Sequence, residues 1–529
     1  MVKKQKFWII LMASVAALLM LLYLLVIAPL VKKRAETLLP EPPELLEGEV
    51  CDSDNAILMF EHVERKDIQS IEVHNSYGEY LCYRRAEDGN YYLKGYELAP
   101  FSADTLASLV VASGYTVTVE RVSTQCTEWE KYGLGAEDSP AWYTLTKTDG
   151  KTHKVYIGKL IPSGGGYYAR YEGRDALYVL GASIHSTLLV PVENLITPYL
   201  GYAMDSSNYA QTAHVLLRKN GENFVQISYD ADAVAESQAS NIPLRSAYRM
   251  NFPARYIVND DRYSEVLLSF CALKGYSTLK VGKTGEPLHN DERLMAQYGF
   301  SDLSNAPYEL YYEYEKMKSI VLFAPSGIDG HYFAYSYVYN LIALVETETV
   351  PYLTWTIRQY VNDLIFTDSL DDSVSKIEVS GTLIKDAQTQ KPISESFSMV
   401  RDPEKGVVSV MPQSTGVALN ASEIWNFRQF YFVLCSPTFA GFIQDDAVSS
   451  YDPNKLMATI RVTLWNGTVH EYKYYWYSGS RCCVTISDGK SEAVLSEFYV
   501  QRSQVEKILS DAERAARGLT VDRNQEFSW

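Results

Sequence analysis

An uninterrupted apolar segment near the N-terminus is the feature that most constrains this chain. Residues 7–31, which start at Phe7 and end at Val31, carry no charged side chain, and three basic residues stand on each side of them. The segment is longer than the roughly 20 apolar residues with which an α-helix crosses a bilayer. It is also longer than the apolar region of a cleavable signal peptide, which has about 7 to 15 residues. We therefore predict an uncleaved signal anchor that binds the lipid bilayer; a cleaved signal is the alternative.

The orientation of the chain follows less directly from its charges. Lys and Arg near a span govern its orientation, and here their numbers on the two sides are equal. A short N-terminus is the easier part to keep in the cytoplasm, so residues 1–34 are expected to form a cytoplasmic tip and the anchor. Residues 35–50 contain Pro40, Pro42 and Pro43, which prevent helix formation and predict a stiff spacer. We expect a single-pass protein of the cell membrane whose bulk is extracytoplasmic.

Net charge and cysteine content exclude some classes of protein. The chain of 529 residues carries a formal charge of -17, which disfavours a nucleic-acid partner because phosphates are repelled across an acidic surface. Its 7 cysteines are few and odd in number, which argues against a scaffold built on disulfides. Cys82 and Cys126 remain candidates for one bridge.

Beyond the spacer, three successive regions carry similar patterns, predicted as α+β repeats over residues 51–203, 204–368 and 369–529. In the first, apolar residues alternate in strand-like fashion from Ile68, and a hairpin is expected to turn at Asp149 and Gly150. Residues 102–113 form the expected helix, with Leu109 on its buried face and Gly114 as a left-handed stop.

The second region repeats this order with different residues. A hairpin is expected at Asn220 and Gly221, and a helix from Asp261 that ends at Gly275. The strings KYGL and QYGF place Gly133 and Gly299 166 residues apart. YYARY and YFAYS place Ala169 and Ala334 165 residues apart, and this constant spacing favours a duplication over chance similarity.

The third region is more divergent. Its opening SKIEV resembles the QSIEV of the first region, and Asn420 with Glu423 forms the pattern of a helix capping box. A hairpin at Asn466 and Gly467 and a closing helix over residues 496–517 are expected. Chance similarity among β-rich segments remains the alternative for this copy. The predicted fold class is α+β: an N-terminal transmembrane helix followed by repeated antiparallel-sheet units, each with a packed helix.

Three short motifs of the first region occur together in one known family. Lys131 to Leu134 read KYGL, Val155 to Gly158 read VYIG, and Tyr167 to Arg170 read YYAR. With the N-terminal span and the strand pattern around them, residues 67–199 resemble the bacterial domain of unknown function 4340. The resemblance implies a membrane-anchored extracytoplasmic accessory of ABC transporters of the gliding-motility auxiliary type, with a transporter permease as partner.

Motifs that carry chemistry are incomplete in this sequence. Gly282, Lys283 and Thr284 suggest a P-loop, but the glycine required five positions earlier is Ser277. The eight histidines show no metal-ligand spacing, and Asp52 with Asp54 lacks the glycine and closing glutamate of a calcium loop. We therefore predict no catalytic, cofactor-binding or metal-binding residues and no enzyme activity.

These observations lead to a non-enzymatic, membrane-anchored scaffolding component of an ABC-transporter-type envelope complex. The abundant tyrosines leave a cell-wall glycan-binding module as the first alternative, since aromatic rings stack on sugars. The second alternative is an envelope hydrolase whose site is assembled from distant residues.

Overall fold

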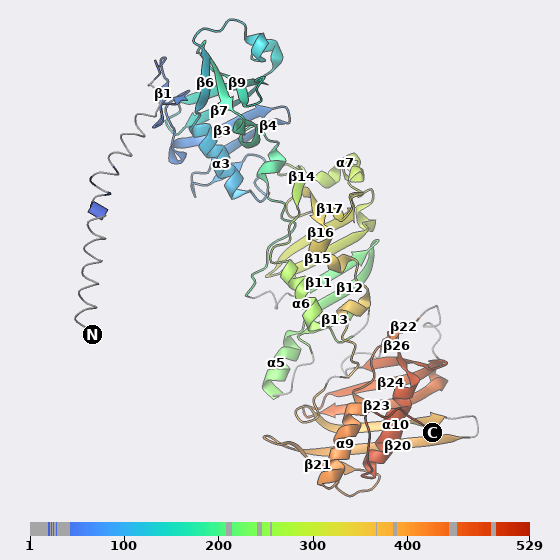
Figure 1. The fold of residues 1–529 in the computed structure, drawn as a ribbon. Helices are drawn as coiled ribbons and strands as arrows, with labels where there is room; N and C mark the ends of the chain where they lie inside the picture. The colour runs from blue at the N-terminus through green and yellow to red at the C-terminus, as the bar shows by residue number, and fades with distance from the viewer. Residues whose placement is uncertain are drawn as a thin grey trace, which may run out of the picture. The chain divides into compact units, whose positions relative to one another are not determined.

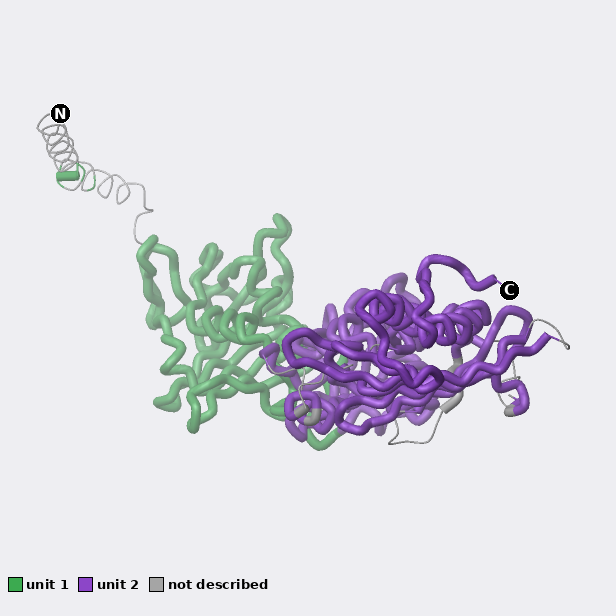
Figure 2. The backbone as a smooth tube through the Cα atoms, turned by 90° about the horizontal axis from the view of Figure 1, so that it is seen from below, with its two compact units in different colours: residues 1–197, 280–286 green, residues 198–279, 287–529 purple. Residues whose placement is uncertain are grey.

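The computed structural model consists mainly of three antiparallel sheets of eight strands each (Figure 1). It describes residues 20, 21, 23, 25, 28, 43–207, 214–240, 246–253, 256–366, 368–384, 389–443, 452–487 and 494–528. By contacts between Cα atoms the chain divides into two compact units (Figure 2). The first comprises residues 1–197 and 280–286, and the second residues 198–279 and 287–529.

The first sheet belongs to the first unit and is preceded by a two-stranded hairpin of β1 (Val50–Cys51) and β2 (Ile57–Leu58). Its strands are β3 (Ile68–Asn75), β4 (Gly78–Arg84), β5 (Tyr91–Leu93), β6 (Thr118–Ser123), β7 (Ala141–Lys147), β8 (Thr152–Leu160), β9 (Gly166–Tyr171) and β10 (Leu177–Gly181). The helical elements are η2 (Arg65–Asp67), α3 (Ala103–Gly114), η3 (Trp129–Tyr132), η4 (Ala136–Asp138), α4 (Ser183–Thr187) and η5 (Val192–Leu195).

The second sheet repeats this plan. Its strands are β11 (His214–Lys219), β12 (Glu222–Tyr229), β13 (Tyr248–Phe252), β14 (Ser277–Val281), β15 (Tyr308–Tyr314), β16 (Met317–Pro325), β17 (His331–Ser336) and β18 (Leu341–Glu346). The helical elements are α5 (Ala231–Ser240), α6 (Asp260–Ser269), η7 (Leu288–Asn290), α7 (Glu292–Gln297), η8 (Leu303–Asn305), η9 (Thr347–Thr349), η10 (Pro351–Leu353) and α8 (Ile357–Tyr360).

The third sheet completes the second unit. Its strands are β19 (Val374–Ile384), β20 (Gln390–Asp402), β21 (Gly406–Pro412), β22 (Gly441–Phe442), β23 (Leu456–Leu464), β24 (Val469–Ser478), β25 (Arg481–Ser487) and β26 (Val494–Gln501). Helices α9 (Ala421–Leu434) and α10 (Arg502–Ala516) pack on each other beside it, and η12 (Pro453–Lys455) precedes β23.

All three sheets have the same strand order. The orders are β5-β4-β3-β7-β8-β9-β10-β6, then β13-β12-β11-β15-β16-β17-β18-β14, then β21-β20-β19-β23-β24-β25-β26-β22. In each sheet the fourth strand along the chain pairs at the far edge, beside the eighth, and a helix (α3, α6 or α9) precedes it. Because sheet topology is hard to repeat by chance, the repeated sheet units are a property of the fold. The residue boundaries predicted for the three regions stay predictions.

The core of the first sheet lies under α3. Leu109 of the helix is buried, as predicted, together with Leu106 and Val110, and so are Ile71 and Tyr143 of the strands. Gly114 has a different role from the one expected. It lies inside α3, its φ is not positive, and a Cβ there would come within 2.4 Å of the Val63 carbonyl oxygen. A glycine is required here because the helix packs closely against the backbone at Val63, and not because the helix ends in a left-handed residue.

The start of the first unit is tied to the edge strand β6. Glu49, whose side chain is fully buried, accepts hydrogen bonds from Arg121 of β6 and from the Tyr178 hydroxyl, the latter at 2.6 Å. Arg174 donates to the Tyr178 hydroxyl at 2.9 Å and to the Glu47 carbonyl oxygen at 2.8 Å. The last residues of the predicted spacer are therefore held against the sheet.

The predicted fold class is wrong. The described chain is mainly β, since more of its residues lie in strands than in helices and each of the three large sheets has eight strands. Among the described residues no helix is both long and apolar enough to cross a membrane, so the predicted N-terminal transmembrane helix is not found among them. Most of the segment from Phe7 to Val31 lies outside the described residues.

Local predictions vary in outcome. The hairpins at Asn220-Gly221 and Asn466-Gly467 are confirmed, and so is the capping box in which the Asn420 side chain accepts from the Glu423 N–H. The closing helix begins at Arg502 rather than at residue 496, because β26 occupies the preceding residues and pairs with β25. Cys82 and Cys126 are both buried and free.

The burial of α3 yields a first prediction. Leu109 is 0% exposed, so Leu109→Ala should leave a cavity and lower the free energy of unfolding of the first unit by about 2–5 kcal/mol. Amide hydrogen exchange in α3 and β3 measures this loss. Val111 of the same helix is 58% exposed, and Val111→Ala should change the free energy by less than about 0.5 kcal/mol. Equal effects of the two substitutions would contradict the assigned helix face.

Candidate functional site

The face of the first sheet opposite α3 carries a row of aromatic and basic side chains. His74 pairs with Trp142, Trp142 with Tyr156 and Tyr156 with Arg170, so the four residues lie side by side on β3, β7, β8 and β9. Each is only partly buried, while their sequence neighbours point into the core. With Lys154 of β8 and Trp129 of η3 these residues form what we call the ladder surface.

Cations of the ladder surface lie over aromatic rings. The Lys154 ammonium is 4.3 Å from the Trp142 ring centroid and 5.1 Å from that of Tyr156. The Arg170 guanidinium carbon is 4.7 Å from the Trp129 ring centroid and 5.8 Å from that of Tyr156. Within the described part of the chain neither cation forms an ion pair with a carboxylate. Such contacts contribute about 0.5–1 kcal/mol each where they are solvent-exposed.

Carboxylates bound the ladder surface without an ion pair to either cation among the described residues. Glu79 lies 2.9 Å from Nδ1 of His74, which stacks on Trp142 with 5.5 Å between ring centroids and 12° between ring planes. Glu172 accepts a hydrogen bond of 2.9 Å from the Tyr156 hydroxyl. The surface thus presents aromatic edges, two cations and a partly acidic rim.

The family motifs explain how the ladder surface is built. The turn after η3 places Gly133 at φ 69°, in the left-handed region, and a Cβ on Gly158 of β8 would come within 2.3 Å of the Tyr132 carbonyl oxygen. The KYGL turn therefore lies directly on the strand of the VYIG motif. Its Tyr132 ring packs edge-on against Tyr168 of the YYAR motif, with 4.8 Å between centroids. This packing holds Trp129 beside Arg170.

The equivalent face of the second sheet is covered by apolar packing and carries an internal ion pair. Counting from Ala169 and Ala334, Tyr335 stands where Arg170 does, and its cross-strand row is Leu322, Glu309 and Arg218. Leu322 and Tyr335 are buried in an apolar cluster below α7, and Arg218 pairs with Glu309 at 2.8 Å.

The exposed face of the third sheet is neutralised by ion pairs. Glu471 of β24 contacts Arg461 at 2.5 Å and Lys473 at 2.7 Å. The three sheets thus share a strand order but differ on this face, and the first sheet alone carries the family's YYAR arginine.

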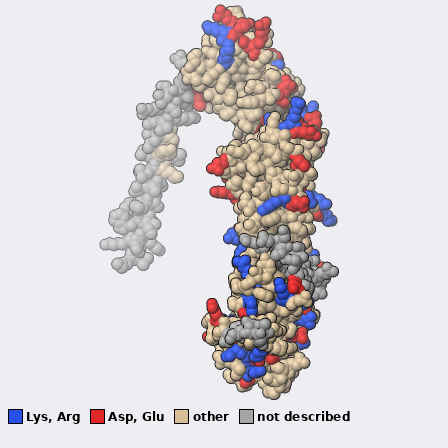
Figure 3. All heavy atoms as spheres, turned by 90° about the vertical axis from the view of Figure 1, so that its right-hand side faces the viewer, with Lys and Arg blue, Asp and Glu red and all other residues tan. Residues whose placement is uncertain are grey.

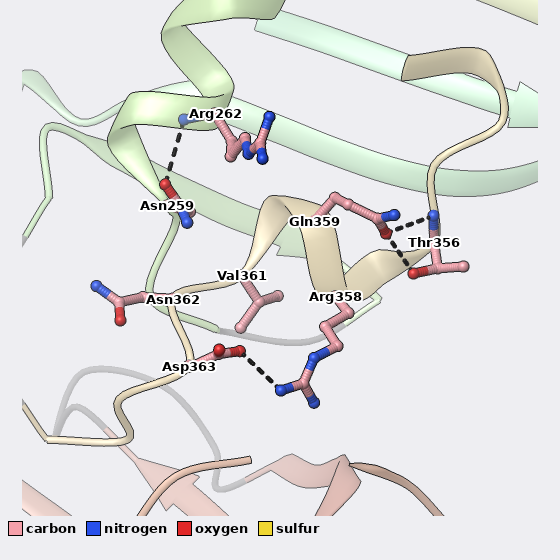
Figure 4. A pocket seen from close by; sticks show the side chains of 8 residues that line it. All are labelled: Asn259, Arg262, Thr356, Arg358, Gln359, Val361, Asn362 and Asp363. Carbon is pink, nitrogen blue, oxygen red and sulfur yellow. Dashed lines mark hydrogen bonds and ion pairs between the residues drawn. The ribbon is translucent and has the colours of Figure 1, made fainter. Parts of the chain in front are cut away.

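Elsewhere on the molecule, charged side chains are mixed. On the face drawn in Figure 3, acidic and basic groups are interspersed. A polar cleft of about 510 Å³ lies at the start of α6 (Figure 4). Its Arg358 pairs with Asp363 at 3.3 Å, and its Arg262 pairs with Glu265 at 3.3 Å. Because these charges are balanced, the cleft offers no net charge for an ionic ligand.

The buried groups of the third sheet do not form an activated nucleophile. The Tyr431 hydroxyl donates to the Asp368 carbonyl oxygen at 2.5 Å, and the Asp368 carboxylate lies 2.8 Å from Nδ1 of His470. Cys435 adjoins Tyr431, and burial raises the pKa of its thiol to about 12. A cysteine nucleophile acts as the thiolate, so this cluster fits a structural role.

Other motifs considered in the sequence have local structural roles. Thr284 donates its N–H to the Gly95 carbonyl oxygen at 2.6 Å and its hydroxyl to Glu97 at 3.0 Å, in a turn after β14. Asp52 accepts hydrogen bonds from the N–H groups of Asp54 and Ala56, both at 2.9 Å, as in an Asx turn. In the described ranges, no group of three or more His, Cys, Asp or Glu residues could hold a metal ion.

The comparison with protein families bears on the part of the chain that carries this surface. Residues 84–287 match the model of the family described as Domain of unknown function (DUF4340). These residues belong to the DUF4340 family. The resemblance suggested by the three motifs is confirmed over this range, which includes every residue of the ladder surface except His74. No curated protein and no solved structure matches the chain.

No site residue was predicted from the sequence, and the ladder surface was therefore missed. Its motifs contain Tyr156 and Arg170, but strands were assigned without their register. Trp142 and His74 lie outside the motifs, so their place beside Tyr156 becomes visible only in the sheet.

The contact between the KYGL turn and β8 yields a second prediction. Gly158→Ala should push the turn away from the strand, because overpacking costs about 1–3 kcal/mol and neither backbone segment can yield as a side chain would. The displacement of Trp129 from Arg170 is measured by tryptophan fluorescence, and the stability by thermal unfolding. Gly165→Ala is the control, since its nearest atom would be the Ser163 hydroxyl oxygen at 3.9 Å. If Gly158→Ala changed neither the fluorescence nor the unfolding temperature, as expected for Gly165→Ala, the packing of the turn on β8 would be contradicted.

Proposed function

We propose that this chain is a non-enzymatic, extracytoplasmic accessory protein that works by contacting other proteins of an ABC-transporter-type envelope complex. The observation that carries the proposal is the ladder surface. Interfaces between proteins are enriched in Trp, Tyr and Arg, the residues gathered here on a rigid sheet. The motifs that build this surface are those that carry the resemblance to DUF4340, so the family likeness and the surface coincide.

The ladder surface is less suited to a wall glycan. Sugars stack on an open ring face, whereas the Trp142 ring is already stacked by His74 and approached by Lys154. Protein side chains, in contrast, bind through edges, hydrogen bonds and charges as well as through ring faces. These contacts favour a protein partner over the glycan-binding alternative.

We further propose that the segment from Phe7 to Val31 holds the protein at a lipid bilayer. Its composition supports this, and Met20, Leu21, Tyr23 and Leu25, which are described, are all exposed apolar side chains. Exposed apolar groups gathered in one segment mark contact with a membrane or a partner. Confinement to the bilayer surface would raise the effective concentration of the ladder surface near a membrane-embedded permease.

The location is tested in intact cells from which the wall has been removed. A membrane-impermeant protease should digest the chain beyond residue 50 and leave a short N-terminal tag intact, because the bulk is proposed to lie outside. Lysed cells are the control, in which the tag is digested as well. Full protection of the bulk in intact cells would contradict the proposed location.

The proposed function is tested by photo-crosslinking. With p-benzoylphenylalanine in place of Tyr156, irradiation of cells should link the full-length protein to a multi-span permease, identified by mass spectrometry. The same group in place of Phe432, which is 53% exposed on α9, should not capture that permease. Retention on purified peptidoglycan, with no protein captured from position 156, would favour the glycan-binding alternative instead.

A further inference from the structure

The two cations of the ladder surface lie near each other on adjacent strands of a chain that is acidic overall. The chain has 65 acidic and 48 basic residues, and an ion pair with a carboxylate would neutralise either cation. Arg170 and Lys154 lack one in the described part of the chain and contact aromatic rings instead. Nε of Arg170 is moreover a buried donor without a hydrogen-bond acceptor. A buried donor without an acceptor costs free energy, which the contact of the guanidinium with the Trp129 ring offsets in part.

The other two sheets show how the same fold neutralises this face. Glu309 pairs with Arg218 in the second sheet, and Glu471 pairs with Arg461 in the third. The rim carboxylates of the first sheet, Glu79 and Glu172, bind His74 and Tyr156 and leave the two cations unpaired. A carboxylate of another molecule could pair with the cations of the first sheet, as carboxylates of this chain pair with Arg218 and Arg461 in the other two sheets.

From this we infer that the ladder surface binds an extended acidic peptide segment of a protein partner, whose carboxylates pair with Arg170 and Lys154. The inference rests on the proposed function and names the chemistry of the partner. Arg170 lies opposite Tyr156, and Lys154 is two residues from Tyr156 on the same strand, so the two cations are diagonal neighbours. Diagonal neighbours in an antiparallel pair are about 7–8 Å apart.

This separation matches the geometry of an extended peptide. Alternate side chains of a strand are separated by about 6.5–7 Å and point the same way. Acidic residues at positions i and i+2 would therefore reach both cations, while adjacent acidic residues would point to opposite sides. Arg170 can bind a carboxylate through two parallel N–H groups, and its stacking on Trp129 already fixes the plane of the guanidinium.

The test uses the full-length protein in mild detergent and fluorescein-labelled peptides. The probe contains Thr-Glu-Thr-Glu-Thr; one control peptide has Gln for each Glu, and another has the same composition with its two Glu residues adjacent. Fluorescence anisotropy should show binding of the alternating peptide, roughly tenfold weaker binding of the adjacent one and none of the Gln peptide. Equal affinity for the alternating and Gln peptides would overturn the inference.

Substitutions in the protein test whether Arg170 and Lys154 bind the alternating peptide. Arg170→Gln and Lys154→Gln should each weaken binding of the alternating peptide by roughly tenfold, with the thermal unfolding temperature unchanged. Lys94→Gln removes the same charge from an exposed site of the same unit and should stay within about twofold of the unchanged protein. Unaltered affinity in the first two variants would overturn the assignment.

Two further outcomes separate this inference from its alternatives. If polygalacturonate, a carboxylated polysaccharide, binds more tightly than the peptide and loses affinity in the same variants, the partner is a glycan and the inference is wrong. If position 156 crosslinks to a permease but the acidic peptide does not bind, the proposed function stands and the inference fails. If the peptide binds through both cations but no protein is captured, the proposed function fails and the peptide site stands.

Discussion

An open sheet of eight strands must cover two edges and two faces, and this requirement governs the whole molecule. An uncovered edge presents free N–H and C=O groups that invite pairing with other chains. In the first sheet the edge strand β6 is covered by the hairpin of β1 and β2, and Arg121 is held by the buried Glu49. In the third sheet the edge strand β21 donates the Val407 N–H to Asp371, which also accepts two hydrogen bonds from Arg428.

The Asp371–Arg428 pair shows what such an edge contact involves. The two hydrogen bonds from Arg428 keep the pKa of the Asp371 carboxyl below its ordinary value. Asp371 therefore contributes stability while it is ionised, and this contribution is lost as the pH falls through its lowered pKa. The contact is partly exposed, so solvent screening keeps its contribution small. Its main effect is geometric, because it occupies the edge that another strand would otherwise use.

Much of this architecture could be predicted from sequence, but not the parts that depend on register. Asn-Gly turns and the Asn420 cap are local signals, and they located hairpins and a helix correctly. Register is not local. A two-residue turn at Asp149 and Gly150 would pair Trp142 with Ile157, whereas the sheet pairs Trp142 with Tyr156. Since a slip of one residue moves a side chain to the other face, the ladder surface could not be assembled from turn signals.

The glycines of the family motifs illustrate a second limit of sequence reasoning. Gly133 has a left-handed backbone, with φ 69°, a conformation that glycine adopts without steric cost. Gly158 carries no such signal, because its φ is ordinary and only the approach of the Tyr132 carbonyl oxygen excludes a side chain there. The second sheet has Ala324 at the corresponding contact, 2.9 Å from a Cβ built on Gly299. The first sheet brings its turn closer to the strand, which is how Trp129 reaches Arg170.

The three outer faces also show how one topology can hold different surfaces. The second sheet buries its outer face with apolar side chains such as Leu322. The third sheet pairs opposite charges there, such as those of Arg461 and Glu471. Either arrangement stabilises a sheet without any partner. The first sheet has neither at Arg170 and Lys154, and a contact between a cation and an exposed ring is weaker than a charge-assisted hydrogen bond to a carboxylate. In the proposed peptide complex a carboxylate of the partner would supply this stronger interaction, and the strands on both sides would fix the positions from which the two cations reach it.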